Sequence, residues 1–352
     1  MKNDSDGRDL GEPLAAHQID EVVLADYLRK HILGFGNSCT VQQFRGGQSN
    51  PTYLLQANGK SYVLRKKPPG ELLPSAHAVD REFRVIKALN SSDVPVPTAL
   101  HLCEDETVIG QMFYVMNYVG GRVFSDITLP DCTPAERTSA YLSAASVLSR
   151  LHAVDYRAVG LESFGKPDNY VARQVARWSK QYELSKTEEC SAMDVLIAWL
   201  SANEPDDNRS AIVHGDYRPG NLIFSNDDMT VAAVLDWELS TIGHPLADLG
   251  YFLLPYHLNE NLRGHSLRGI ELEGLGIPTE QALLQAYSEN GPAVSNIEYY
   301  IAFSMFRLAA ILAGVLRRGI DGNASDPSAI ERGRAYSLFA ESALEIISGT
   351  RR

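Results

Sequence analysis

The stretch "IVHGDYRPGNLIFS", residues 212–225, decides the fold. An apolar run leads into His214 and Asp216, and apolar residues return directly after Asn221. A carboxylate and a carboxamide therefore stand close together on a turn between two segments that both have the pattern of buried strands. A second carboxylate, Asp236, lies in the next apolar run, "VAAVLDWE". If the three runs form one small sheet with both turns at the same end, these polar side chains converge.

These residue types favour phosphoryl transfer. Asn221 and Asp236 offer hard oxygen ligands of the kind that Mg²⁺ prefers. Asp216 is then left to accept a proton from a hydroxyl group. Phosphoryl transfer needs this division of roles, because its catalysis consists mainly of positioning and of neutralising charge. The spacing also matches the kinase catalytic loop H-R-D-x-x-x-x-N, with Gly215 in place of the arginine.

Composition narrows the class of protein. The chain has 352 residues, of which 44% are hydrophobic and 22% are charged, and its net charge is −12. Because Lys and Arg form no long run, we expect no nucleic-acid partner. The longest apolar segment, residues 301–316, is interrupted by Arg307 and is shorter than the roughly 20 residues of a membrane span. We therefore expect a cytoplasmic protein with no membrane partner.

The first third of the chain alternates short β patterns with two helical ones. The helical patterns cover residues 18–33 and 76–89. Strand patterns lie at residues 39–44, 52–57, 61–67, 94–105 and 111–121. The "NGK" between the second and third of these is a strong signal for a tight hairpin. An antiparallel sheet with one inserted helix follows.

Long helical patterns dominate after Gly121, at residues 134–153, 169–185, 190–203 and across most of 279–348. The sequence thus predicts an α+β protein in three parts. These are a disordered tail at 1–17, a small lobe with an antiparallel sheet at 18–119, and a larger, mainly helical lobe at 120–348.

"HGDYRPGN" followed by "LDWE" resembles the paired motifs of the aminoglycoside phosphotransferase and choline kinase family, which has a protein-kinase-like fold of two lobes. With the features of the first lobe, the resemblance covers most of residues 20–340. It implies that Asp216 is the catalytic base, that Asn221 and Asp236 bind Mg²⁺, and that ATP is the phosphate donor.

The resemblance also implies supporting roles near the base. His214 resembles the structural histidine that braces the catalytic loop through backbone hydrogen bonds. Asp248, in "GHPLADLGY", resembles the acidic residue that steadies this loop. A helix N-cap is the alternative for Asp248.

"FRGGQSNPTYLL", residues 44–55, lies where the family's phosphate-covering loop belongs, although it lacks a G-x-G-x-x-G pattern. Its two glycines, Gly47 among them, are also compatible with a simple hairpin turn. Given the motifs downstream, Gly47, Ser49 and Asn50 become candidates for contacts to the β and γ phosphates.

In "YVLRKKP", Arg65 occupies the position of the phosphate-binding lysine of protein kinases. A register error of one residue would turn Lys66 or Lys67 to that face instead. Glu82, on the inserted helix, is then expected to pair with Arg65, with a solvated helix charge as the alternative. "FYVMNYVGG" resembles the hinge, where the Asn117 carbonyl and the Val119 amide would bind adenine.

The acceptor is the least constrained part of the prediction. Tyr300, Phe303 and Arg307 share one helical face, and they either line the acceptor site or pack in the core. No A-P-E sequence follows the metal aspartate, so a small molecule is favoured over a protein as acceptor. The wider pattern looks closest to the kinase-like domain found beside acyl-CoA dehydrogenases, which implies a hydroxylated acyl-CoA. An aminoglycoside, a choline-like alcohol, and a nucleotide-binding module without turnover remain as alternatives, and the oligomeric state is not predicted.

Overall fold

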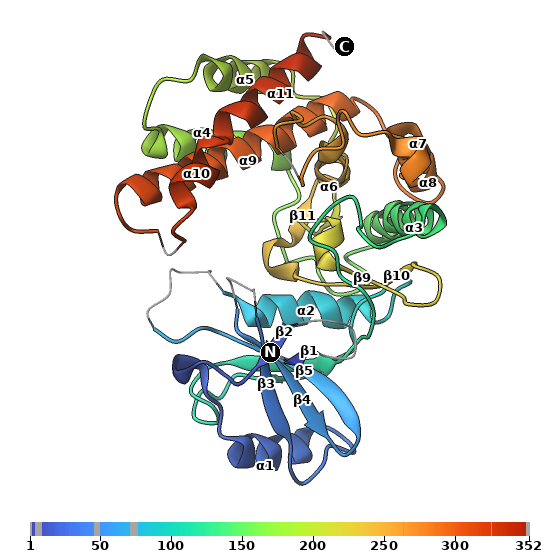
Figure 1. Cartoon of the computed structure of the whole chain (residues 1–352), viewed down its shortest axis with the longest axis vertical. Helices are drawn as coiled ribbons and strands as arrows, with labels where there is room; N and C mark the ends of the chain where they lie inside the picture. The colour runs from blue at the N-terminus through green and yellow to red at the C-terminus, as the bar shows by residue number, and fades with distance from the viewer. Residues whose placement is uncertain are drawn as a thin grey trace. The chain divides into compact units, whose positions relative to one another are not determined.

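A computed structural model describes residues 2–3, 9–45, 50–70, 77–262, 264–324 and 326–349. The chain divides into two compact units (Figure 1). The first unit comprises residues 1–123, 158–161 and 221–240, and the second comprises residues 124–157, 162–220 and 241–352.

The first unit contains a seven-stranded antiparallel sheet in the order β1-β2-β3-β4-β5-β7-β6. Its strands are β1 (Lys2–Asn3), β2 (Asp9–Gly11), β3 (Thr40–Phe44), β4 (Thr52–Ala57), β5 (Lys60–Lys66), β6 (Ala99–Cys103) and β7 (Phe113–Asn117). Asn58 and Gly59 join β4 to β5 with φ of 49° and 72°. A two-residue hairpin turn needs positive φ at both positions, so the prediction from "NGK" is confirmed.

One face of this sheet packs on helix α1 (Glu21–His31). The helix begins at Asp20, whose side chain accepts hydrogen bonds from two backbone amides, and it buries Leu24 and Leu28. Tyr62 and Leu64 of β5 belong to the same core. Because side chains alternate along a strand, Arg65 points to the opposite face, where helix α2 (Val79–Leu89) lies against β6 and β7.

The N-terminal segment is ordered from residue 9 to 17. Strand β2 pairs with β3, Leu10 is buried, and the Leu14 amide donates to the Gln43 side chain. A short 3-10 helix, η1 (Ala15–His17), follows. The prediction of a disordered tail at 1–17 is therefore wrong for residues 9–17, because apolar Leu10 extends the core at the sheet edge.

Residues 221–240 form a hairpin that belongs to the first unit, not to the predicted helical lobe. Strands β9 (Leu222–Phe224) and β10 (Val231–Val234) pair antiparallel, and the 3-10 helix η3 (Trp237–Leu239) packs on α2. The Val234 amide donates to the Pro95 carbonyl. Strand β8 (Ala211–Val213) pairs with β11 (Thr241–Gly243) instead of β9. The expectation of one small sheet is therefore wrong.

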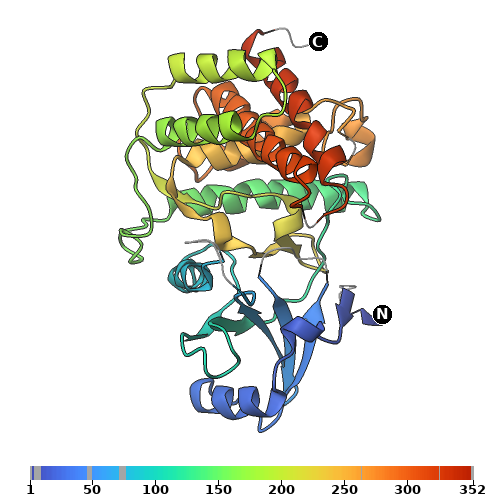
Figure 2. The same cartoon turned by 90° about the vertical axis from the view of Figure 1, so that its left-hand side faces the viewer.

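The second unit is mainly helical, as predicted. Its helices are α3 (Pro134–Ala153), α4 (Tyr170–Ser185), α5 (Ser191–Ala202), α6 (Pro245–Phe252), α7 (Leu272–Leu275), α8 (Glu280–Ser288), α9 (Ile297–Ile320), α10 (Ala329–Arg334) and α11 (Tyr336–Ile347). Two more 3-10 turns are η2 (Pro219–Asn221) and η4 (Leu254–Tyr256). Figure 2 shows α4 and α5, in yellow-green, beside the orange-red α9 and α11.

Helix α9 is the central helix of this unit and contacts α4, α5, α6, α10 and α11. It is long and apolar enough to cross a membrane, but 72% of its most apolar window is buried inside the protein. Such burial is what a core helix of a globular unit shows.

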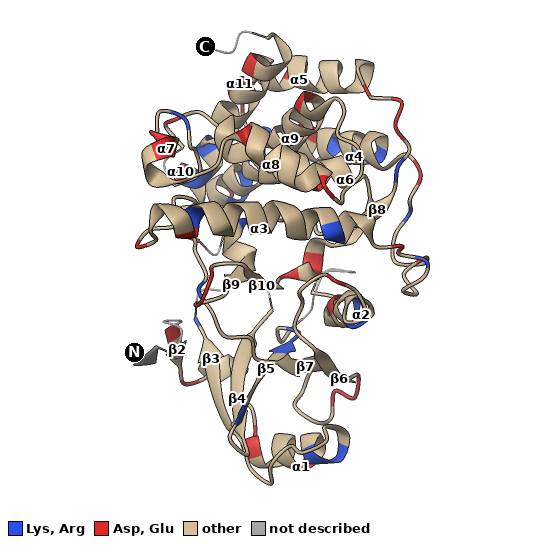
Figure 3. Cartoon of the chain, turned by 90° about the vertical axis from the view of Figure 1, so that its right-hand side faces the viewer, with Lys and Arg blue, Asp and Glu red and all other residues tan. Residues whose placement is uncertain are grey.

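Charged residues of both signs are interspersed along each unit. Figure 3 shows Asp and Glu positions between the Lys and Arg positions on the helices of the second unit and on the strands and helices of the first.

Candidate active site

The loop after β8 is braced by Asp248, a buried residue in α6. Its carboxylate accepts hydrogen bonds from the His214 amide at 2.5 Å and from the Gly215 amide at 2.8 Å. Burial opposes ionisation of this carboxyl, but the bond from His152 and the nearby donors outweigh it and lower the pKa of Asp248. The N-cap of α6 is His244, so the cap alternative for Asp248 is wrong and the bracing prediction is confirmed.

His214 holds the same loop from inside. Its ring is fully buried, and Nδ1 accepts a hydrogen bond from the Asp216 amide at 3.2 Å. Gly215 has a φ of +86°, a conformation that residues with a side chain rarely adopt. This explains why glycine stands where the kinase pattern has arginine.

The side chain of Asp216 extends from the loop and is 25% exposed. The Tyr251 hydroxyl donates a 2.5 Å hydrogen bond to Oδ1, and Arg218 Nε lies 3.5 Å from Oδ2. Burial raises the pKa of the Tyr251 hydroxyl, and the Asp216 charge raises it further, so the phenol stays a donor at neutral pH. Sequence reasoning did not single out Tyr251. Its signal was the three-residue spacing from Asp248, which places both on one face of α6.

The three residues proposed for the acceptor from α9 separate in the structure. Tyr300 and Phe303 are each 1% exposed and pack in the core, where Tyr300 stacks on His244 at 4.6 Å. Their predicted role in the acceptor site is therefore wrong, because α9 is covered on that face by other helices. Arg307 instead donates from Nη2 to the Gly215 carbonyl and lies 5.2 Å over the Tyr251 ring. It supports the loop and Tyr251.

Asn221 and Asp236 lie in the first unit, at the same end of the β9–β10 hairpin. The Leu235 amide donates to the Asn221 carbonyl at 2.8 Å, which joins the two segments. Asp236 has a left-handed backbone with φ of 64°, and 32% of its side chain is exposed. A carboxylate and an amide suit Mg²⁺, which takes few protein ligands and completes its shell with water and phosphate oxygens. Because Asp216 belongs to the other unit, the meeting of all three around one ion stays a prediction.

Arg65 is the basic residue that pairs with α2. Its Nε lies 3.0 Å from Glu82 Oε2, and its Nη2 donates to Asp236 Oδ1 at 2.7 Å. Burial raises the pKa of Glu82 to about 7, although the charge of Arg65 opposes this shift. Lys66 lies on the other face of β5, 5.6 Å from the Tyr53 ring. The predicted pair of Arg65 and Glu82 is confirmed.

Asn50 supports Glu82 in the structure. Its amide donates to Glu82 Oε1 at 2.6 Å, its Oδ1 lies 3.0 Å from His77 Nδ1, and the residue is 5% exposed. The Tyr114 hydroxyl donates to the other oxygen of Glu82 at 3.0 Å. The prediction of a phosphate contact from the Asn50 side chain is therefore corrected to a bracing role. Gly47 and Ser49 lie outside the described residues.

The predicted hinge follows β7, whose last residue is Asn117. The Asn117 side chain accepts a hydrogen bond from the Thr98 amide and donates to the Tyr118 carbonyl at 3.3 Å. It thereby ties the end of β7 to the segment before β6. The adenine contacts of the Asn117 carbonyl and the Val119 amide stay predictions.

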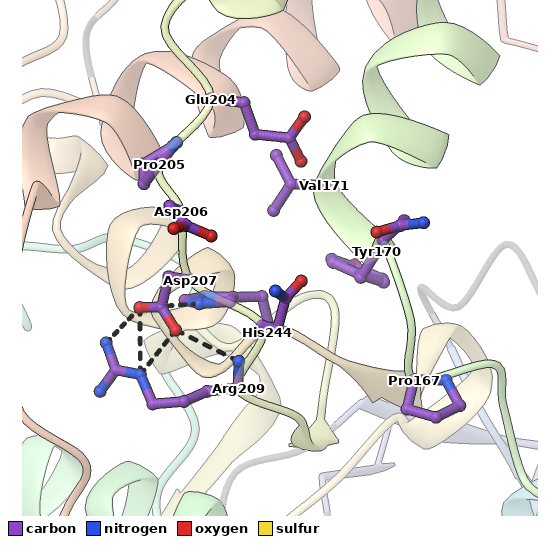
Figure 4. Close-up of a pocket in the computed structure, with 11 residues that line it drawn as sticks. Pro167, Tyr170, Val171, Glu204, Pro205, Asp206, Asp207, Arg209 and His244 are labelled. Atoms are coloured by element: carbon purple, nitrogen blue, oxygen red, sulfur yellow. Dashed lines mark hydrogen bonds and ion pairs between the residues drawn. The ribbon is translucent and has the colours of Figure 1, made fainter.

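A polar cavity of about 330 Å³ lies at the start of β8, at the opposite end of that strand from Asp216 (Figure 4). One of its acidic residues, Asp207, is already paired, because its Oδ2 lies 2.5 Å from Arg209 Nη2 and 3.2 Å from His244 Nε2. Figure 4 shows the Asp207 carboxylate turned toward both partners. This cavity is consequently separate from the loop chemistry.

Comparisons with known proteins agree on the family. Residues 40–290 match the model described as the phosphotransferase enzyme family. Acyl-CoA dehydrogenase family member 10 of Mus musculus is 45% identical over 330 residues, which are 92% of this chain and 31% of that protein. The chain thus spans about a third of that relative.

Solved structures show the same fold. A protein from Ralstonia eutropha described as a candidate aminoglycoside phosphotransferase is 43% identical, with a TM-score of 0.86 over 94% of this chain and 99% of that one. A spectinomycin phosphotransferase, solved with ADP and spectinomycin, is 12% identical, with a TM-score of 0.60 over 94% and 99%. The second likeness concerns the fold alone.

Proposed function

The chain belongs to the phosphotransferase enzyme family, and from this membership we propose that it moves the γ-phosphate of ATP, with Mg²⁺, to a hydroxyl group of a small molecule. The observation that carries the proposal is the state of Asp216. The carboxylate stands partly exposed at the end of a loop that Asp248 and His214 hold by its backbone amides. A general base needs such a fixed and accessible position.

In this proposal Asp216 accepts the proton of the acceptor hydroxyl as its oxygen bonds to the γ-phosphorus. The bond from that phosphorus to the bridging oxygen of ADP breaks, and the proton later passes to solvent. Tyr251 and Arg307 keep the carboxylate and its loop in place. Such transfer depends on positioning and charge neutralisation more than on covalent chemistry.

The first unit supplies the charge side of the reaction. Asn221 and Asp236 would hold Mg²⁺, which neutralises charge on the phosphates when it is bound. The planar guanidinium of Arg65 lies between the carboxylates of Glu82 and Asp236. In this proposal, part of the guanidinium also contacts the α and β phosphates. Glu82, Asn50 and Tyr114 fix its position.

For the acceptor we propose a hydroxylated acyl-CoA. The support is the 45% identity to a protein named as an acyl-CoA dehydrogenase family member, of which this chain matches 31%. A kinase for a hydroxyl group on an acyl chain and a dehydrogenase for acyl chains would act on related molecules. An aminoglycoside or a choline-like alcohol is the alternative acceptor.

A panel assay tests the proposal. Purified protein receives ATP, Mg²⁺ and, in separate reactions, hydroxyacyl-CoA thioesters, choline and kanamycin, and the phosphorylated product is measured by mass spectrometry. Asp216→Asn is the matched control, because it keeps the size of the side chain and removes its basicity. Product formed by the wild type but not by Asp216→Asn supports the kinase proposal. ATP binding without product across the panel would instead identify a nucleotide-binding module without turnover.

A further inference from the structure

A second cavity of the second unit is lined by two residues that contact Asp216, Arg218 and Tyr251, and its lining differs from that of the polar cavity. Its volume is about 80 Å³. The main apolar residues that line it are Ile127, Phe252, Leu254, Leu258, Leu308 and Phe339. They come from the segment before α3, from α6, from η4 and the residues that follow it, and from α9 and α11. We call this space the apolar cavity.

Two of its lining residues also contact the candidate base. Tyr251 lines the apolar cavity and donates its hydroxyl hydrogen to Asp216 Oδ1. Arg218 lines it as well, with Nε 3.5 Å from Asp216 Oδ2. A molecule whose hydroxyl group reached Asp216 would therefore have its neighbouring atoms close to two residues that line the cavity.

The size of the cavity limits what enters it. Pockets that bury a whole drug-sized ligand have volumes of about 300–1,000 Å³. A space of about 80 Å³ takes only a short segment of a larger acceptor. Ring systems of an aminocyclitol are wider than a linear hydrocarbon segment and match the space less well.

The charges around the cavity also favour a hydrocarbon segment over a polycationic ring system. Of the described residues that line it, none is acidic, while Arg218 keeps a half-exposed guanidinium, 46% exposed, at the side of Asp216. Burial lowers the pKa of His265, and the positive charges of Arg218 and Arg332 lower it further, although the Asp126 carboxylate opposes the shift. Within the lining a cationic group would meet the Arg218 guanidinium and no carboxylate, because Asp216, the ion-pair partner of Arg218, lies beside the cavity and not in its lining.

We propose that the apolar cavity receives an unbranched hydrocarbon segment of the acceptor, next to the hydroxyl group that is phosphorylated, and so selects neutral or anionic acceptors with an alkyl chain over polycationic sugars. This inference rests on the proposed kinase function. To the proposed function it adds the residues that determine specificity. Leu308 and Phe339 contact the alkyl chain of the acceptor, and Arg218 disfavours positive charge beside that alkyl chain.

A chain-length series tests the cavity. The acceptors are 3-hydroxyacyl-CoA thioesters with 4, 6, 8 and 10 carbons, and kcat/KM is measured for each. Each methylene group that enters the cavity should raise kcat/KM by about four-fold, until the cavity is full and the values level off. Values that do not change with chain length would overturn the inference while leaving the kinase proposal intact.

A pair of variants on α9 locates the effect. Leu308 and Leu312 are both half-buried and lie one turn apart, but only Leu308 is among the residues that line the cavity. Leu308→Phe should fill the space, flatten the chain-length series and lower kcat/KM for the longest thioester at least ten-fold. Leu312→Phe should leave the series as it is. An equal response of the two variants would contradict the assignment.

Binding is measured separately from turnover. Calorimetry with the same thioesters on Asp216→Asn, and on Asp216→Asn combined with Leu308→Phe, reports the cavity without the reaction. Affinity that rises with chain length only when Leu308 is present supports the cavity even if no product forms. Absence of that difference sinks the inference, and absence of product with wild-type enzyme sinks the proposed function alone.

Discussion

The hydroxyl of Tyr251 and Oδ1 of Asp216 lie 2.5 Å apart, in a hydrogen bond that the phenol donates. Both the aromatic ring and the guanidinium of Arg307 above it belong to the unit that carries the loop of Asp216. The bond fixes the rotation of the carboxylate, and the position of its second oxygen follows from it.

We expect Tyr251→Phe to lower kcat roughly ten- to hundred-fold with little change in the KM for ATP. A hydrogen bond to a charged group contributes about 1.5–3 kcal/mol, and its loss lets the carboxylate rotate. Steady-state kinetics give the split between kcat and KM. Tyr256→Phe is the control, because that hydroxyl donates to the Pro278 carbonyl and not to the base. Similar losses in both variants would indicate general damage to the fold.

We expect Asp216→Ala and Asp236→Ala to fail in different ways. Loss of the base should reduce transfer about 100- to 10,000-fold and leave the affinity for Mg-ATP nearly unchanged. Loss of Asp236 should weaken that affinity, because one metal ligand and the partner of Arg65 are removed. Calorimetric titration with Mg-ATP distinguishes the two. Unimpaired turnover in either variant would remove its residue from the mechanism.

We expect Asn50→Ala to destabilise the first unit by about 1–3 kcal/mol, because it leaves one oxygen of the buried Glu82 carboxylate without its donor. Urea unfolding followed by fluorescence measures the change. Asn58→Ala, at the tip of the β4–β5 hairpin, is unsuitable as a control because of its positive φ. Gln56→Ala, an exposed position of β4, serves instead and should change stability by less than about 0.5 kcal/mol.

We expect His244→Asn to flatten the loss of stability on acidification. Burial lowers the pKa of His244 below 6.5, although the Asp207 carboxylate opposes the shift. Below pH 6.5 the unfolded chain therefore binds a proton that the folded chain resists, and stability falls as the pH falls, by at most about 1.4 kcal/mol for each pH unit. Asparagine keeps an acceptor for the N-cap of α6.

Urea midpoints at pH 7.5, 6.5, 5.5 and 5.0 measure this effect for the wild type and the variant. Other buried histidines are the same in both proteins, so the difference between the curves isolates His244. Parallel curves would show that its ring does not resist protonation in the fold.

Local patterns predicted strands β3 to β7 and helices α1 and α2 of the first unit, but not strand β2 or the membership of residues 221–240 in that unit. The pair of Arg65 and Glu82 was expected because both positions match the lysine and glutamate of the family, and the structure confirms it. The loop after β8 was recognised because few chemistries need a base and an amide at that spacing.

The errors arose where a third element decides the outcome. Helical spacing predicted correctly that Tyr300 and Phe303 share a face of α9. The spacing within one helix does not show which other elements cover that face. Strand β8 was expected to pair with its neighbour in sequence, whereas its partner β11 arrives about thirty residues later. Asn50 was assigned to phosphate because the residues next to it in sequence do not show that the fold brings it to Glu82, which lies on another element.

Helix α6 contributes Asp248 to the backbone of the loop and Tyr251 to the carboxylate, one turn apart on the same rod. The loop and the Asp216 carboxylate are consequently both held by α6. Phe252, the next residue, lines the apolar cavity, so the same short helix forms part of the cavity wall. If an acceptor chain binds there, we expect a poor fit to lower turnover as well as affinity.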